Sequence, residues 1–152
     1  MSSELLDISL TKLVEDMRQS EKDMQRLLRD AEAMMSHVDW KSVRGRAKSS
    51  EEGRKLYKSM ITHLVDAYTG IISNCSTHGA ACTMSADFVQ AQMLFLSKRD
   101  NQSLDWILQE ANASSSDGSV AEELLRISDS FAELSSHALA CLKKYLYISS
   151  GI

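Results

Sequence analysis

The sequence contains no proline, only six glycines and only three phenylalanines among its 152 residues. Proline and glycine build tight turns, and aromatic and β-branched side chains favour strands. Their scarcity argues against a sheet. Leucine, methionine, alanine, glutamate and lysine, which favour helices, are abundant. We therefore predict an all-α protein that forms a single domain over residues 1–152.

Further absences exclude several classes of protein. Three cysteines cannot form a disulfide framework, and an odd number fits reduced thiols in the cytoplasm. A net charge of −4 argues against nucleic acid as a partner. The first ten residues lack the basic and apolar regions of a signal peptide, and no apolar run is long enough to span a bilayer. We expect a cytoplasmic location, either free or peripheral at a membrane.

Motifs that indicate catalysis are also missing. The sequence has no Gly-x-Ser-x-Gly element and no glycine-rich phosphate loop. Its paired carboxylates, Glu51-Glu52 and Glu122-Glu123, stand near predicted helix starts, where they stabilise the helix dipole. We therefore expect that the protein is not an enzyme and has no catalytic residue and no cofactor.

Cysteine and histidine fall on two predicted helices. Cys75, His78 and Cys82 share one helical face, and His137 and Cys141 lie one turn apart on a later helix. Antiparallel packing could bring the two groups together as a zinc site. The alternative is that the cysteines are small core residues. Because there is no Cys-x-x-Cys pair, we favour the core interpretation and expect no metal.

Residues 119–148 show the most regular hydrophobic pattern, with apolar residues at alternating steps of four and three. This spacing places them on one face of a long helix. Ser119 and Glu122 form a capping box at its start. The apolar positions are Val120, Leu124, Ile127, Phe131, Leu134, Ala138, Cys141, Tyr145 and Ile148.

The same rhythm predicts helices over residues 3–39 and 50–98, and a short helix over residues 102–112. A break near residues 76–80 would split the second helix into two, but we favour one long helix. The average spacing of 3.5 residues is typical of coiled-coil seams. We predict an antiparallel bundle of three long amphipathic helices and one short helix.

The long middle helix carries a second apolar stripe beside the first. An isolated chain buries one stripe per helix, so we expect one of them to face a second copy or another protein. This second stripe runs through Met60, Leu64, Ala67, Ile71, Ala81, Met84, Phe88, Ala91 and Phe95. The candidate interaction seam comprises Phe88, Phe95, Leu124, Ile127, Phe131 and Leu134.

A basic segment over residues 40–58 contains only two acidic residues, and Trp40 flanks it. Such a segment attracts anionic lipid at about 1 kcal/mol per charge, and it can equally contact an acidic partner. The alternative is a solvated junction between two helices. Its basic residues are Lys41, Arg44, Arg46, Lys48, Arg54, Lys55 and Lys58.

The stretch "DGSVAEELLRISDSFAELSSHALACLKKYL" resembles the start of the second helix of BAR domains. The resemblance covers residues 55–148 and includes an acidic loop residue, a valine, leucines and a Ser-Phe pair. The matching positions are Asp117, Val120, Leu124, Leu125, Ser130, Phe131, Glu133 and Leu134. The resemblance implies dimerisation along the helices and binding to curved, anionic membrane. The basic concave face of that family is represented here only by residues 41–58 and the pair Lys143-Lys144.

The absence of catalytic motifs and the presence of three apolar seams favour a non-enzymatic interaction or scaffold domain. We expect it to self-associate as a homodimer or to act as an adaptor subunit for another protein. The alternative function is a BAR-like dimer that binds curved anionic membrane.

Overall fold

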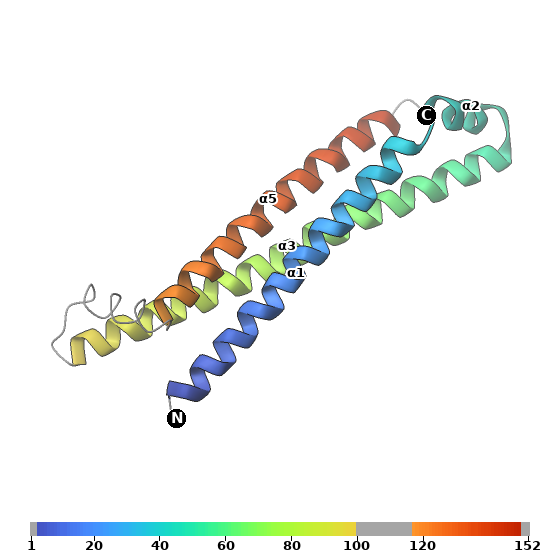
Figure 1. Cartoon of the computed structure of the whole chain (residues 1–152). Coiled ribbons are helices and arrows are strands. Elements are labelled where there is room, and N and C mark those ends of the chain that lie inside the picture. Colours follow the sequence, from blue (N-terminus) through green and yellow to red (C-terminus); the bar gives the residue numbers. More distant parts are fainter. Residues whose placement is uncertain (1–2, 100–116, 150–152) are drawn as a thin grey trace. The chain divides into compact units, whose positions relative to one another are not determined.

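The computed structural model describes residues 3–99 and 117–149, and this part of the chain forms four α-helices. In chain order they are α1 (Ser3–His37), α2 (Trp40–Ser49), α3 (Glu51–Arg99) and α5 (Asp117–Ser149) (Figure 1). Neither described range contains a strand. The all-α prediction is confirmed, and the long helices pack against one another as a bundle.

The three long helices begin and end within a few residues of their predicted bounds. α3 is one helix of 49 residues, as we favoured. It continues through Gly70 and Gly79 because a glycine costs a helix only about 1 kcal/mol relative to alanine. The short helix predicted over residues 102–112 lies outside the described residues.

The short helix α2 lies where the sequence predicts only a junction between the first two long helices. Asp39 caps its start by accepting a hydrogen bond from the Ser42 backbone N–H at 3.2 Å. At its end, the Ser50 backbone N–H donates to the Arg46 carbonyl at 3.0 Å. Ala47, which is 1% exposed, is the buried residue of this helix. A ten-residue helix with so little apolar character has no stripe that a periodicity search can recognise.

The start of α3 passes very close to the end of α2. A Cβ atom added to Gly53 would lie 2.2 Å from the Arg46 carbonyl oxygen and 2.8 Å from Ser50 Oγ. The Ser50 hydroxyl also accepts a hydrogen bond from the Gly53 backbone N–H at 3.0 Å, which caps α3. This approach requires glycine at position 53.

The chain forms two units, and α1, α3 and α5 each contribute to both. Unit 1 consists of Met1–Lys22 and Thr77–Ala132, and unit 2 consists of Asp23–Ser76 and Glu133–Ile152. The single domain predicted over residues 1–152 stays a prediction, since these units share three helices.

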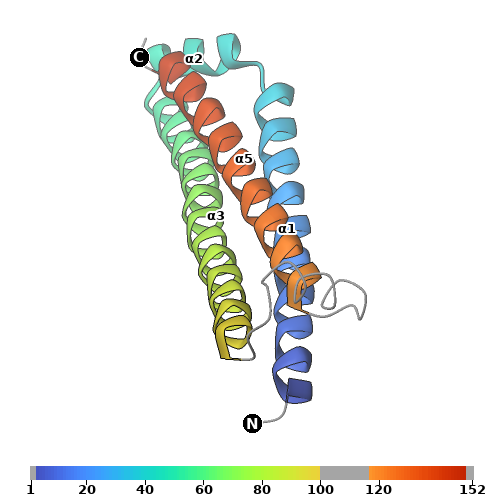
Figure 2. The same ribbon diagram turned by 90° about the vertical axis from the view of Figure 1, so that its left-hand side faces the viewer.

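Unit 1 has a core in which the N-terminal part of α5 packs against α3. Ser128 of α5 donates a hydrogen bond to the Gly79 carbonyl at 3.1 Å, and its hydroxyl lies 2.8 Å from Thr83 Oγ1. Figure 2 shows the same part of α5 beside α1. The buried apolar side chains of this unit are Leu10, Val14, Cys82, Ala86, Val89, Ala121, Leu124, Ile127 and Phe131.

Unit 2 contains α2, and Trp40 at the start of this helix contacts both α1 and α5. The Trp40 ring lies edge-on to Tyr145 of α5 with the ring centroids 5.0 Å apart. Its Nε1–H donates to the Met35 carbonyl of α1 at 2.8 Å. One aromatic side chain therefore joins three helices. The core of this unit is formed by Met24, Leu28, Ala31, Ala47, Tyr57, Leu64, Tyr68, Ile71, Cys75, Ala138 and Tyr145.

We predict that Gly53→Ala destabilises the protein by about 1–3 kcal/mol, because the new methyl group must displace backbone atoms of α2. Gly45→Ala in α2 is the matched control: a Cβ there meets no atom within 4 Å, so this variant should be about 1 kcal/mol more stable. Urea unfolding followed by circular dichroism measures both values. Equal effects of the two substitutions would contradict the close approach at Gly53.

Candidate functional site

The predicted interaction seam divides into buried and exposed members. Leu124, Ile127 and Phe131 are fully buried in the core of unit 1, so they contact residues of their own chain. Leu134 is half-buried in unit 2. Phe88 is 54% exposed. Phe95 lies in α3, and its side chain is outside the described residues.

Large apolar side chains on the outer side of α3 in unit 1 are open to solvent. Met84 is 72% exposed and Phe88 is 54% exposed. Thr77, Ala80 and Ala91 are also exposed and follow the same helical spacing. We call these five residues the α3 face. A contiguous exposed patch with large apolar side chains is typical of an interaction surface.

The α3 face is also poor in charge: its five residues are uncharged, and the exposed Asp87 lies beside Phe88. Residues 67–86 form a run of twenty positions without a lysine, arginine, aspartate or glutamate. The outer side of a surface helix ordinarily carries charged residues, which keep it in water. The second stripe predicted on this helix is covered in unit 2, where Leu64 and Ile71 are buried, and is open in unit 1 at Met84 and Phe88.

The basic segment is mostly exposed. Trp40 is only half-buried, but its ring and its N–H are both engaged inside unit 2. It therefore stabilises α2 and does not extend from the surface as a lipid anchor. Arg44 is half-buried. The other six basic residues, Lys41, Arg46, Lys48, Arg54, Lys55 and Lys58, are exposed.

The two units carry net charges of opposite sign. Unit 2 has eleven lysine and arginine residues against eight aspartate and glutamate residues, a net charge of +3. Unit 1 has six against thirteen, a net charge of −7. The overall charge of −4 hides this separation.

The cysteines of α3 are core residues. Cys75 is buried in unit 2 and Cys82 is buried in unit 1, and both are thiols. Burial raises the pKa of both groups, that of Cys82 to about 11. The ring of His78 packs 5.7 Å from that of Phe131 in unit 1. These positions agree with the core interpretation of Cys75 and Cys82.

An ionic cluster links α1 to α5 in unit 1. Arg126 of α5 donates to Glu21 of α1 at 3.2 Å and to Glu123 of its own helix at 2.9 Å. Arg18 of α1 also pairs with Glu123, at 2.9 Å. Glu21 is 8% exposed, so its pairing with Arg126 offsets the cost of removing its charge from water. The sequence gives no sign of this cluster, because only its Glu123–Arg126 pair is local.

A second polar cluster links α1 to α5 in unit 2. Glu32 Oε1 of α1 accepts a hydrogen bond from Cys141 Sγ at 3.4 Å and contacts His137 Nε2. Burial raises the pKa of the Cys141 thiol, and so does the hydrogen bond to Glu32. Tyr68, which is fully buried and donates a hydrogen bond to Met35 Sδ at 3.9 Å, acts in the opposite direction on this pKa.

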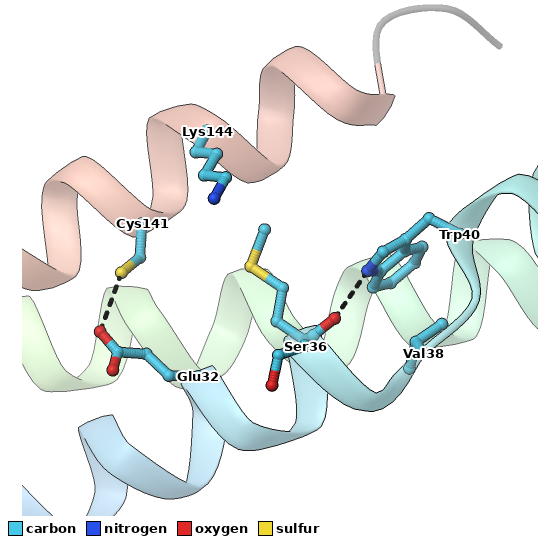
Figure 3. A pocket seen from close by; sticks show the side chains of 7 residues that line it. Glu32, Ser36, Val38, Trp40, Cys141 and Lys144 are labelled. Atoms are coloured by element: carbon cyan, nitrogen blue, oxygen red, sulfur yellow. Dashed lines mark hydrogen bonds between the residues drawn. The ribbon is translucent and has the colours of Figure 1, made fainter.

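A cavity of about 400 Å³ lies beside this cluster. Figure 3 shows Cys141 and Glu32 pointing toward each other from α5 and α1, with Lys144 one turn beyond Cys141. Mostly apolar side chains from the end of α1, from the α1–α2 connection and from the start of α2 line the rest. The lining residues are Glu32, Met35, Ser36, Val38, Trp40, Cys141 and Lys144.

Comparison with protein-family models, with curated proteins and with solved structures gave no match to this chain. Within residues 3–99 and 117–149, no helix has both the length and the apolar character needed to cross a membrane.

We predict that Arg126→Gln lowers the free energy of unfolding at pH 7 by about 1–2 kcal/mol, because it removes charge-assisted hydrogen bonds. Hydrogen bonding from Arg126 is the main cause of the lowered pKa of Glu123. A carboxyl group with a lowered pKa in the folded state stabilises the protein above its unfolded pKa. This stabilisation is lost as the pH falls through its folded pKa. The wild type should therefore lose stability below about pH 4.5, and Arg126→Gln should lose less over the same range.

Arg26→Gln serves as the control, because Arg26 pairs with the exposed Asp23 of its own helix at 3.4 Å. Exposed pairs of this kind contribute at most about 1 kcal/mol. Denaturant unfolding between pH 3 and pH 7 measures all three proteins. Identical pH profiles for the wild type and Arg126→Gln would show that this cluster does not stabilise the fold.

Proposed function

We propose that this chain is a self-associating helical scaffold whose α3 face pairs with a second copy of the same chain. The observation that carries the proposal is the exposure of Met84 and Phe88 on an α3 face whose five residues are all uncharged. Both side chains are large, and Phe88 belongs to a residue class that often anchors protein interfaces. Burying them against another chain would remove their apolar surface from water at about 25 cal/mol per Å².

A second copy fits the α3 face because the chain itself carries complementary surfaces. Unit 1, which holds this face, has a net charge of −7, whereas unit 2 has a net charge of +3. Opposite charges favour contact between unit 1 of one copy and unit 2 of the other. Unit 2 also offers apolar contacts, because its large exposed apolar residues are Leu27, Met34, Leu56, Leu139 and Leu146.

A two-fold dimer would make this contact twice and leave neither copy with an unmatched surface. The doubling matters because a specific interface generally needs about 1,000 Å² of buried surface. The small residues Thr77 and Ala80 also allow a neighbouring helix to approach α3 closely. The dimer would serve as a scaffold in which the surfaces not used for pairing remain accessible to other proteins.

We predict that Phe88→Glu raises the dimer dissociation constant at least about thirty-fold, the effect of losing about 2 kcal/mol at an interface anchor. The added negative charge would face the basic unit 2 of the partner and would by itself strengthen binding. Weaker binding of this variant would therefore report the loss of the apolar contact. Gln90→Glu is the matched control, because Gln90 is exposed on the same helix and the charge change is identical. Analytical ultracentrifugation over a concentration series measures the dissociation constants.

Dimerisation should also weaken as salt rises, because opposite net charges attract the two units. A wild-type chain that stays monomeric at all concentrations would overturn the proposal. Equal dissociation constants for Phe88→Glu and Gln90→Glu would show that the dimer uses another surface.

Binding to anionic membrane is a second candidate function, favoured by the exposed basic residues of α2 and of the start of α3. Six of the seven basic residues over residues 41–58 are exposed in unit 2, whose net charge is positive. This agrees with the resemblance to BAR domains, which implies a dimer on a curved anionic surface. The dimer proposed above is compatible with such a role.

We predict that the double variant Arg54→Glu/Lys55→Glu binds phosphatidylserine-containing vesicles at least about tenfold more weakly than the wild type. The control Lys12→Glu/Lys22→Glu makes the same charge change at two exposed positions of unit 1 and should bind like the wild type. Vesicle sedimentation at two salt concentrations measures binding. Equal loss in both variants would indicate an effect of net charge alone and exclude a specific basic surface.

A further inference from the structure

The polar cluster of unit 2 contains three different metal-binding side chains. His137 and Cys141 lie four residues apart on α5, so both project from the same side of the helix. Glu32 approaches them from α1. One potential ligand atom from each residue lies within 4.8 Å of the other two.

We propose that Glu32, His137 and Cys141 form a zinc site with a fourth coordination position open to the neighbouring cavity. A thiolate sulfur, an imidazole nitrogen and a carboxylate oxygen are the three ligand types that zinc accepts. Three protein ligands with one open position are typical of zinc sites that hold water or another small ligand. The cavity beside Glu32 and Cys141 provides space for that ligand.

The spacing of the donor atoms suits this ion. Zinc binds nitrogen and oxygen at roughly 2.0–2.2 Å and sulfur at roughly 2.3 Å, which places neighbouring ligand atoms of a tetrahedron roughly 3–4 Å apart. Glu32 Oε1 and Cys141 Sγ are already 3.4 Å apart. His137 is on the solvent side of the cluster, with 56% of its side chain exposed. Small side-chain rotations of the exposed His137 would therefore admit the ion without movement of the helices.

Zinc binding would replace the proton on Cys141 and the direct contact between Glu32 and His137. The thiol proton passes to solvent, and His137 binds through a neutral nitrogen. The hydroxyl of the buried Tyr68 acts on the sulfur ligand from the core, in the direction that lowers the pKa of Cys141. Such outer groups orient metal ligands and tune their affinity.

The positive charge of Lys144 is compatible with a zinc ion only when the ligands of that ion neutralise its charge. Its ammonium group lines the cavity beside Glu32 and Cys141, where it would repel a divalent cation that had not bound these anionic ligands. A zinc ion that has accepted a thiolate and a carboxylate carries no net charge with its ligands. Lys144 can then donate a hydrogen bond to water or an anion bound at the fourth position.

The test uses the full chain after removal of metal with a chelator. Calorimetric titration with zinc chloride should give one ion per chain. Titration with cobalt(II) should give the visible bands of a tetrahedral site and a thiolate-to-cobalt band, and the thiolate band should be missing in Cys141→Ser. His137→Ala and Cys141→Ser should each weaken zinc binding at least about tenfold.

His37→Ala is the matched control, since His37 is an exposed histidine at the end of α1. It should bind zinc like the wild type. Circular dichroism checks that each variant is folded; if Cys141→Ser is unfolded, the cobalt spectrum of the wild type decides alone.

Absence of a thiolate-to-cobalt band in the wild type would overturn the proposal. So would equal zinc affinity in folded Cys141→Ser and the wild type. The cluster uses no residue of the α3 face, so this result is independent of self-association.

Discussion

The pairing of α1 with α5 is the interaction on which both units depend. These helices are separated in sequence by the whole of α3, yet each unit joins them through a carboxylate of α1 and polar groups of α5. In unit 1, Glu21 meets Arg126, and in unit 2, Glu32 meets His137 and Cys141. The buried Glu21 must have such a partner, because leaving a buried charge unpaired costs several kcal/mol. These pairs therefore favour one register of α1 on α5.

Apolar burial supplies most of the stabilisation, and the ionic contacts select among packings that bury similar areas. The fully buried side chains of α5, such as Leu124 and Phe131 in unit 1, stabilise any arrangement of the helices that covers them. An arrangement that left Glu21 without Arg126 would lose much of this stabilisation, because a buried charge would be unpaired. The same division of roles applies in unit 2, where Tyr68 and Tyr145 fill the core and Trp40 fastens α2 to it.

The proposed functions use what this internal packing leaves outside. Met84 and Phe88 are on the uncovered side of α3, and the exposed lysines and arginines of unit 2 are on its surface. A helix that presents large apolar side chains to water gains free energy by association. Separation of positive and negative charge between the units then favours one orientation of the partner. The three proposed zinc ligands lie outside the α3 face and outside the basic segment, so zinc binding can be separated from self-association and from membrane contact.

Composition determined the fold class, and local periodicity determined the bounds of the three long helices within a few residues. It also identified the buried face of α5, because a repeat of four and three places Leu124, Ile127 and Phe131 on one side of any helix. Periodicity cannot recognise a short polar helix, and for this reason α2 was missed. It also cannot tell which of two apolar stripes on α3 is covered, since covering depends on the neighbouring helices.

Only the tertiary structure decided which side chains meet across helices. Sequence spacing grouped Cys75, His78 and Cys82 correctly on the inner side of α3, where Cys75 and Cys82 are buried. It also placed His137 one turn from Cys141, but gave no reason to add Glu32, which is 105 residues from His137. The sequence specifies the face that each helix turns inward through the local geometry of 3.6 residues per turn. The register between two helices comes from packing and charge pairing over long distances, and it is this register that brings Glu32 to Cys141.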